Sequence, residues 1–203
     1  AKKLKAINTL KLNCDKEWSA TNTDVDGFVY PLKSLNLKNK QSLVLGSGGA
    51  ARSVIQGLIN LNLSTISVVS RNKTSLDELT KNFGDQIEIK GLLNNERIVE
   101  NLIEEADLIV NTTPVGMKTA AHEVKILPYG ETFWRSLNCK TIIYDLIYNP
   151  AQTPLLKFCE KRGCMTINGL QMLIAQGAKS LSFWTDGLEV PFDVMNDALK
   201  KYL

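Results

Sequence analysis

The stretch Ser42–Ser53 reads SLVLGSGGAARS and is the strongest indicator of the fold in this chain. A short apolar run ends at Gly46, and an apolar pattern with helical spacing begins a few residues later. This order predicts a strand, a tight glycine turn and the start of a helix. The turn fits the G-x-G-x-x-A form of the dinucleotide-binding fingerprint, with Gly46, Gly48 and Ala51 at its three small positions.

Each small residue of this turn meets a different steric requirement. Gly46 permits a sharp turn out of the strand, Gly48 lets the backbone approach a pyrophosphate, and Ala51 lets the helix pack close to the strand. The pyrophosphate would bind the free N–H groups at the helix N-terminus. The alternative is an ordinary turn, because glycines cluster in turns. The flanking strand and helix favour cofactor binding, for which we predict contacts from Gly46, Ser47, Gly48, Gly49 and Ala50.

The composition is that of an ordinary globular protein and excludes several classes of function. Of the 203 residues, 44% are hydrophobic and 22% are charged, and the formal net charge is +3. This weak charge, with no basic block, predicts no nucleic-acid partner and no membrane surface. The four cysteines form no C-x-x-C pair, and His122 is the only histidine, so we predict no metal site. Free thiols favour a reducing cytoplasm.

Short apolar runs alternate with helical patterns along the rest of the chain, and this alternation predicts an α/β fold. We expect a Rossmann-like, doubly wound parallel sheet with helices on both faces. Pro31 should break the first helix, and Thr74 or Ser75 should cap the third. The expected strands cover 6–12, 42–45, 65–69, 87–90, 107–111, 141–145 and 165–167, and the expected helices cover 24–35, 49–61, 74–83, 96–105, 153–162, 169–184 and 191–202.

The first 23 residues read as a hairpin that we expect to belong to a larger sheet. A two-stranded hairpin alone is marginally stable. We therefore expect it to be the remnant of a second α/β lobe whose beginning the chain lacks. The predicted organisation is a remnant of that lobe in 1–23, a cofactor-binding domain in 24–188, and a C-terminal helix in 189–203 that packs back toward the lobe.

The residues after the second strand of the sheet indicate which dinucleotide would bind. An acidic residue at this place binds the ribose 2′-hydroxyl of NAD, but the chain has none here. Arg71 offers a planar fork that can grip a phosphate and stack on adenine. The alternative is a solvated basic loop. We predict NADP(H) rather than NAD(H), with contacts from Ser70, Arg71, Asn72 and Lys73.

Several separate stretches, in order along the chain, resemble the shikimate dehydrogenase family. The A-I-N-T segment that starts at Ala6 resembles the family's A-V-N-T, and the glycine loop matches as well. In the clamp after the second strand, Ser70 and Asn72 depart from the family's N-R-T. The other matching motifs are N-T-D at 22–24, N-T-T-P-V-G-M at 111–117, Y-D-L-I-Y-N-P-A-Q-T-P at 144–154 and G-L-Q-M-L-I-A-Q at 169–176.

The resemblance implies reversible reduction of 3-dehydroshikimate to shikimate by hydride transfer from NADPH. In that family a lysine and the aspartate of N-T-D form the central polar pair of the site, and Asp24 stands at the aspartate's position. By the same resemblance the substrate-binding residues are Asn8, Asp24, Tyr148 and Gln176, and Asp24 is the catalytic one. Contacts on the nicotinamide side are expected from Thr112, Thr113, Pro114, Gly169 and Met172.

Structural roles for the same residues stay open at this point. Asp24 can cap the helix that follows it, and Asn8 can be a satisfied polar residue at a strand end. Gln176 can be an ordinary exposed glutamine, Tyr148 a packing residue and Met172 a core residue.

One departure from the family bears on activity. The family's lysine precedes the A-V-N-T segment, and Lys2, Lys3 and Lys5 stand too close to Asn8 to match it. We therefore expect an NADP-dependent oxidoreductase whose isolated chain lacks turnover. A non-catalytic NADP-binding module and a quinate-using relative are the alternatives. Apolar surface left by a missing lobe would favour self-association into a homodimer.

Overall fold

The structure is a computed structural model and describes residues 4–93, 96–118 and 127–199. His122, Lys2, Lys3 and the end of the last expected helix lie outside these residues. The strands are β1 (Thr9–Leu12), β2 (Trp18–Thr21), β3 (Gln41–Leu45), β4 (Thr65–Ser70), β5 (Glu88–Leu93), β6 (Leu108–Asn111), β7 (Ile142–Asp145) and β8 (Thr166–Ile167). The helices are α1 (Asp24–Val29), α2 (Gly49–Asn60), α3 (Lys73–Phe83), α4 (Glu96–Glu105), α5 (Pro154–Glu160), α6 (Leu170–Trp184) and α7 (Phe192–Leu199), with 3₁₀ turns η1 (Tyr30–Leu32) and η2 (Glu131–Trp134).

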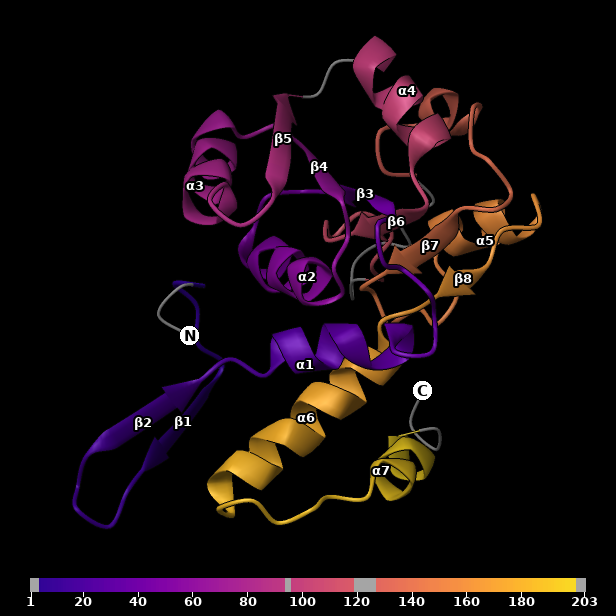
Figure 1. The fold of residues 1–203 in the computed structure, drawn as a ribbon. Coiled ribbons are helices and arrows are strands. Elements are labelled where there is room, and N and C mark those ends of the chain that lie inside the picture. The colour runs from indigo at the N-terminus through magenta and orange to yellow at the C-terminus, as the bar shows by residue number, and fades with distance from the viewer. Residues whose placement is uncertain (1–3, 94–95, 119–126, 200–203) are drawn as a thin grey trace.

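Strands β3 to β8 form one sheet in the order β5-β4-β3-β6-β7-β8, and every neighbouring pair is parallel. Figure 1 shows this sheet in the upper part of the molecule. Numbered within the sheet, the order is that of the dinucleotide-binding doubly wound fold, with the direction of winding reversing between β3 and β6. The prediction of a Rossmann-like parallel sheet is confirmed.

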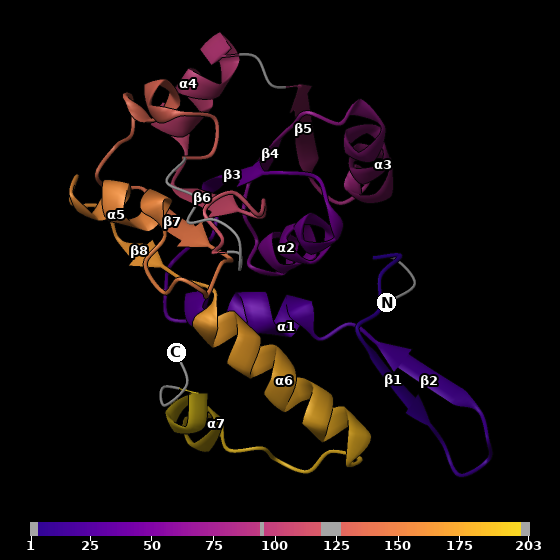
Figure 2. The ribbon, with the colours of Figure 1, turned by 180° about the vertical axis from the view of Figure 1, so that it is seen from behind.

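The alternation of side chains along the strands divides the core into two layers. Val44, Val68 and Val110 point to the face covered by α1, α2 and α3. Leu43 and Ile109 point to the opposite face, where α4, α5 and η2 lie. Figure 2 shows the same two layers of helices from behind. Both faces of the central strands are therefore buried, as parallel sheets require.

Helix α1 fits between α2 and α6 because two glycines permit close approach. A Cβ on Gly27 would lie 2.7 Å from the Met172 carbonyl oxygen, and one on Gly57 would lie 2.5 Å from Phe28 Cδ1. Phe28 stacks on Tyr144 of β7 with ring centroids 5.2 Å apart. The expected helix 24–35 is shorter than predicted: α1 ends at Val29, and η1, with Pro31 inside it, follows.

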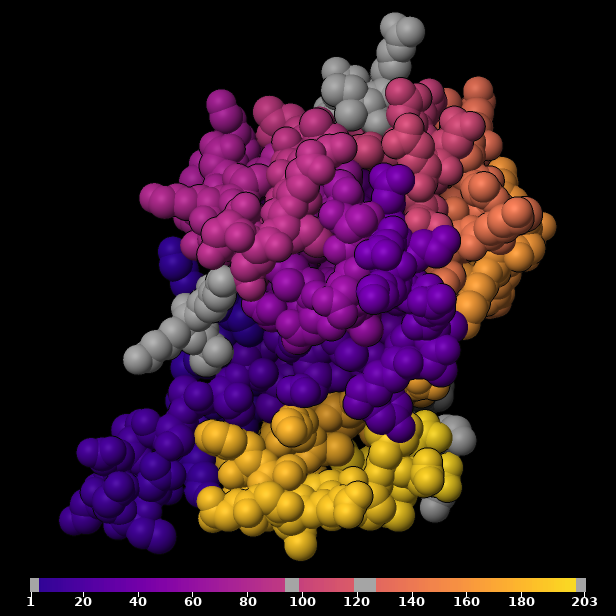
Figure 3. Space-filling model, in the orientation of Figure 1, coloured from indigo at the N-terminus to yellow at the C-terminus, as the bar shows by residue number. Residues whose placement is uncertain are grey.

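The hairpin β1–β2 is antiparallel and forms a sheet of two strands that is separate from the large sheet. In the space-filling view it projects from the lower left of the molecule (Figure 3). Its attachment to the body runs through α6: the Trp184 indole N–H donates to the Leu10 carbonyl oxygen at 2.8 Å. Helix α7 packs on α6, and its Phe192 stacks on Tyr30 with centroids 4.3 Å apart. In the part of the chain that the structure describes, no helix is long and apolar enough to cross a membrane.

Candidate functional site

The glycine turn joins β3 to α2 at the carboxyl edge of the sheet. Gly46 has φ +104°, and a Cβ there would lie 2.7 Å from Thr112 Oγ1, so this position requires glycine. Its N–H donates to the Val69 carbonyl oxygen at 2.8 Å. A Cβ on Gly48, the N-cap of α2, would meet nothing within 4 Å. The backbone at Gly48 is therefore open to a ligand, while the turn at Gly46 is fixed by its neighbours.

A cavity of about 540 Å³ lies at the ends of β3, β4 and β6, where the winding of the sheet reverses. We call it the cofactor cavity. It brings together most of the residues predicted to bind the dinucleotide, whereas Gly49, Ala50, Lys73, Gly169 and Met172 do not line it. Its lining residues are Gly46, Ser47, Gly48, Ser70, Arg71, Asn72, Ser75, Thr112, Thr113, Pro114, Val115, Pro128 and Tyr129.

The loop after β4 is ordered by its own side chains. Ser70 Oγ lies 2.6 Å from Ser47 Oγ, which joins this loop to the glycine turn. Asn72 is the N-cap of α3, and its side-chain oxygen accepts from the Ser75 N–H at 3.1 Å. The prediction of Thr74 or Ser75 as the cap is wrong, because the extended backbone of Asn72 aims its amide oxygen at that N–H. Arg71 is exposed beside this cap.

The loop after β6 is held by a buried carboxylate. Asp145 accepts from Asn111 Nδ2 at 3.0 Å, from the Ile147 N–H at 3.2 Å and from Thr153 Oγ1 at 2.7 Å. Burial raises the pKa of Asp145 to about 6, and the three hydrogen bonds oppose that rise. Thr112 Oγ1 in turn donates to the Leu45 carbonyl oxygen at 2.8 Å. This network fixes the Thr112–Val115 wall of the cofactor cavity.

A second group of polar residues joins the hairpin to α1 and α6. We call Asn8, Thr9, Thr23, Asp24, Gln176 and Ser180 the polar cluster. Asn8 Nδ2 lies 2.8 Å from Asp24 Oδ1 and 3.0 Å from Thr23 Oγ1. Ser180 Oγ lies 2.8 Å from Thr9 Oγ1 and 3.0 Å from Thr23 Oγ1. Thr23 Oγ1 also lies 3.4 Å from Gln176 Oε1. Three of the residues predicted to bind substrate, Asn8, Asp24 and Gln176, are thus brought together.

Asp24 is the half-buried acid of this cluster. Burial raises the pKa of Asp24, and the hydrogen bond from Asn8 opposes the rise. Asp24 does not cap α1: the N-cap is Thr23, which makes no side-chain cap bond, and the Asp24 carboxylate points to Asn8 instead. Among the described residues, no lysine lies within ion-pair distance of Asp24. One carboxylate oxygen is therefore available to a partner from elsewhere.

Three further predicted residues lie around the start of α6 and the end of β7. A Cβ on Gly169 would lie 1.9 Å from the Leu146 carbonyl oxygen, so this glycine lets α6 begin against the β7 exit. Met172 is partly buried and packs on the core. Tyr148 is 41% exposed, and none of the contacts of the polar cluster involves it.

Asn22 connects the polar cluster with the helix that starts at the glycine turn. Its amide Nδ2 donates to the Ala6 carbonyl oxygen at 3.3 Å. Its Oδ1 accepts from the Asp24 N–H at 3.0 Å and from Ser53 Oγ, in α2, at 3.3 Å. A single buried amide therefore ties the hairpin, α1 and α2 together.

Sequence reasoning missed several residues of the two sites. Tyr129 and Pro128 line the cofactor cavity but lie in a stretch without strand or helix periodicity. Asp145 belongs to the matching motif at 144–154, and the signal that could have marked it is an acid at the end of a buried strand. Ser180 gave no local signal, because its partner Thr9 is 171 positions away.

The parallel sheet, glycine turn and cavity at the switch point define a dinucleotide-binding domain of the Rossmann type. Residues 31–123 match the family model described as "Shikimate / quinate 5-dehydrogenase", and residues 169–200 match "Shikimate 5'-dehydrogenase C-terminal domain". The chain belongs to the shikimate dehydrogenase family, as the motifs predicted.

Relatives and solved structures agree with this assignment. The shikimate dehydrogenase (NADP(+)) of Prochlorococcus marinus (strain MIT 9312) is 79% identical over 203 residues, which are 100% of this chain and 71% of the relative. The shikimate 5-dehydrogenase of Listeria monocytogenes, solved with shikimate and NAD, has a TM-score of 0.82 at 28% identity, over 98% of this chain and 69% of the other. A shikimate dehydrogenase solved in complex with NADP+ has a TM-score of 0.84 at 31% identity, over 100% and 68%.

Proposed function

We propose that this chain binds NADP(H) in the cofactor cavity and serves the interconversion of 3-dehydroshikimate and shikimate. The observation that carries the proposal is the cofactor cavity itself, which joins a glycine turn to a basic loop without an acid. The curated relative carries NADP(+) in its name, and a solved relative holds shikimate. The four cysteines are free, which fits a reducing, cytoplasmic setting for this reaction.

The residues of the cofactor cavity fit a phosphorylated dinucleotide. The first amides of α2, beside the exposed Gly48 and Gly49, offer N–H groups that lack intrahelical partners. The loop after β4 presents Arg71 and Lys73, both exposed, and no carboxylate that would repel a 2′-phosphate. Thr112–Val115 forms the opposite wall, on the side expected to face the nicotinamide. When bound, NADPH supplies the hydride.

The polar cluster supplies the groups that orient a polyhydroxylated substrate and handle its proton. Asn8 and Gln176 carry amides able to bind hydroxyl groups, and Asn8 holds the Asp24 carboxylate in place at 2.8 Å. Asp24 keeps one oxygen for a lysine, and that ammonium would give its proton to the alkoxide formed at the reduced carbon. In the reverse direction the same pair would accept the proton of the substrate hydroxyl.

Two alternatives for the same site remain distinct from this proposal. The matched family model includes quinate dehydrogenases, and the polar cluster has no feature that separates the two substrates. The chain alone can also be a non-catalytic NADP-binding module, because Asp24 has no lysine partner among the described residues. We therefore expect the 203 residues to bind cofactor with little or no turnover when assayed alone.

The test is a titration of the chain with NADPH and with NADH, followed by quenching of Trp18, Trp134 and Trp184. NADPH should bind at least about tenfold more tightly, which corresponds to about 1.4 kcal/mol. Tighter binding of NADH would overturn the cofactor assignment. A parallel assay measures shikimate-dependent and quinate-dependent reduction of NADP+; sustained turnover by these residues alone would contradict the need for a lysine from elsewhere. Asp24→Asn should keep NADPH affinity, since Asp24 lies outside the cofactor cavity.

A further inference from the structure

Tyr129 is the one aromatic side chain among the lining residues of the cofactor cavity. The other lining groups are mostly backbone, hydroxyl and amide groups together with the Arg71 guanidinium. Polar groups of this kind serve the phosphates and riboses of a dinucleotide. A purine, by contrast, has two flat faces that bind best against an aromatic ring or a guanidinium plane.

The backbone and hydroxyl of Tyr129 hold the ring in a fixed place. Its φ is +64°, an uncommon conformation for a bulky residue that persists only where neighbours enforce it. The hydroxyl donates to the Val69 carbonyl oxygen at 3.1 Å. The same carbonyl oxygen accepts the Gly46 N–H at 2.8 Å, so Tyr129 is anchored to the glycine turn. Phe133 packs edge-on against the ring, with centroids 5.5 Å apart.

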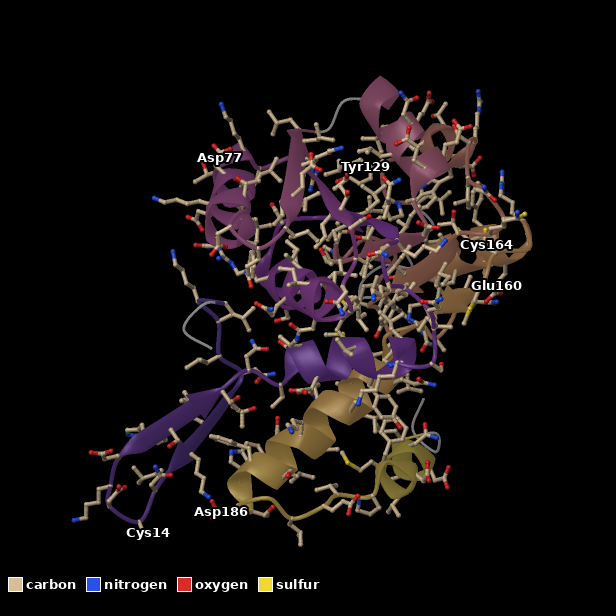
Figure 4. The ribbon with its side chains drawn as sticks, in the orientation of Figure 1. Cys14, Asp77, Tyr129, Glu160, Cys164 and Asp186 are labelled. Atoms are coloured by element: carbon tan, nitrogen blue, oxygen red, sulfur yellow. The ribbon has the colours of Figure 1, made fainter. Side chains whose placement is uncertain are left out.

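Arg71 and the Tyr129 ring share the cofactor cavity. Both residues line the cofactor cavity, one from the loop after β4 and the other from the segment before η2. Burial raises the pKa of the Tyr129 hydroxyl, and the positive charge of Arg71 opposes the rise, which is an electrostatic sign of their proximity. The Arg71 side chain has no hydrogen bond or ion pair with the described residues and is free to stack. Tyr129 is labelled among the side chains of Figure 4.

We infer that Tyr129 forms the aromatic wall of the adenine subsite, so that the adenine lies between its ring and the Arg71 guanidinium. This inference rests on the proposed cofactor site and adds a binding residue to it. The ring carries the contact, and its left-handed backbone and the edge-on Phe133 keep the ring in place even without the hydroxyl bond to Val69. This role could not be predicted from the sequence, because Tyr129 belongs to no motif and lies far from Arg71 along the chain.

The test compares Tyr129→Ala with the matched control Tyr129→Phe in the full chain. The probes are adenosine 2′,5′-bisphosphate, which is the adenine end of NADP, and reduced nicotinamide mononucleotide, which lacks adenine. Tyr129→Ala should lower the affinity for adenosine 2′,5′-bisphosphate by at least about tenfold, which is the loss expected when a base–aromatic stack is removed. Tyr129→Phe keeps the ring and should stay within about threefold of the parent chain. Affinity for the mononucleotide should not change in either variant.

The remaining outcomes distinguish a failure of this inference from a failure of the proposed function. Unchanged affinity of Tyr129→Ala for adenosine 2′,5′-bisphosphate overturns the stacking role. Equal losses in both variants assign the effect to the hydroxyl and also overturn it. A loss of mononucleotide binding as large as the loss of the bisphosphate indicates a collapsed cavity and contradicts a local adenine contact. If the parent chain binds neither NADPH nor the bisphosphate, the proposed cofactor site itself fails.

Discussion

The cofactor cavity and the polar cluster are built in different ways. The cavity follows from buried strands and tight turns: Leu43, Val44 and Leu45 of β3 are at most 1% exposed. The polar cluster follows from side-chain hydrogen bonds between segments far apart in the sequence. Its hairpin leaves Leu12 53% and Trp18 68% exposed. The cavity therefore shares the stability of the sheet, whereas the cluster depends on a few polar contacts.

The variant that should lose the most stability removes the buried carboxylate behind the wall of the cofactor cavity. Asp145→Ala would leave the Asn111 amide, the Ile147 N–H and the Thr153 hydroxyl without their acceptor. We expect the free energy of unfolding to fall by about 3–5 kcal/mol, as when one partner of a buried charged network is removed. Chemical denaturation measures it. A loss below about 1 kcal/mol would mean that water replaces the carboxylate and that the cavity wall does not depend on this network.

The matched control Asp145→Asn keeps the shape and removes the titration. The ordinary pKa of an aspartate is 3.8, and burial raises that of Asp145 to about 6. The native carboxyl therefore holds its proton more tightly than the unfolded one. Lowering the pH from above 6 toward 3.8 should stabilise the parent chain relative to Asp145→Asn, with no further gain below. Denaturation curves of both chains at several pH values check this sign, and an opposite slope would contradict it.

The next effect separates steric fit from backbone strain at the glycine turn. Gly46 and Gly187 have φ of +104° and +101°, so alanine strains both backbones similarly. Only at Gly46 does the new Cβ meet other atoms, with Thr112 Oγ1 at 2.7 Å; at Gly187 nothing lies within 4 Å. Backbone strain should cost both variants about 1–2 kcal/mol of stability, and Gly46→Ala should lose more because Thr112 must move. Gly46→Ala should in addition lower the affinity for NADPH by about 100-fold, which corresponds to about 2.7 kcal/mol of binding free energy. Equal NADPH affinity in the two variants would show that the turn does not shape the cavity.

The glycine turn was predictable because its causes are local. Strand, turn and helix follow one another in Ser42–Ser53, and small residues stand where the backbone needs them. The buried network was harder to predict, because Asn111 and Asp145 meet only through the register of β6 and β7. Tyr129 could not be predicted at all, since no periodicity or motif marks its segment. The motif resemblance named Asn8, Asp24 and Gln176, which lie in one cluster in the structure, but not Ser180, which bonds Thr9 and Thr23 of the same cluster.

A smaller effect tests whether the polar cluster can loosen without the sheet. Asn22→Ala removes the bonds to Ala6, Asp24 and Ser53. We expect a loss of about 1–2 kcal/mol, concentrated in the hairpin. Hydrogen exchange should become faster in Thr9–Leu12 and Trp18–Thr21, while β3 and β6 keep their protection. The control is Asn13→Ala, which removes only a contact to Ser19 inside the hairpin. Equal acceleration in the central strands would show that the two regions unfold as one unit.

The smallest effect concerns the ion pair between Lys11 of the hairpin and Asp186 after α6, which is labelled at the lower end of Figure 4. The Asp186 side chain is 87% exposed, so solvent screens the attraction. Lys11→Gln should change the free energy of unfolding by less than about 0.5 kcal/mol, and less again at high salt. The hairpin should stay attached, because Trp184 still donates to Leu10 and Thr9 still meets Ser180. A loss as large as that of Asn22→Ala would mean that charge, rather than buried hydrogen bonds, holds the hairpin on α6.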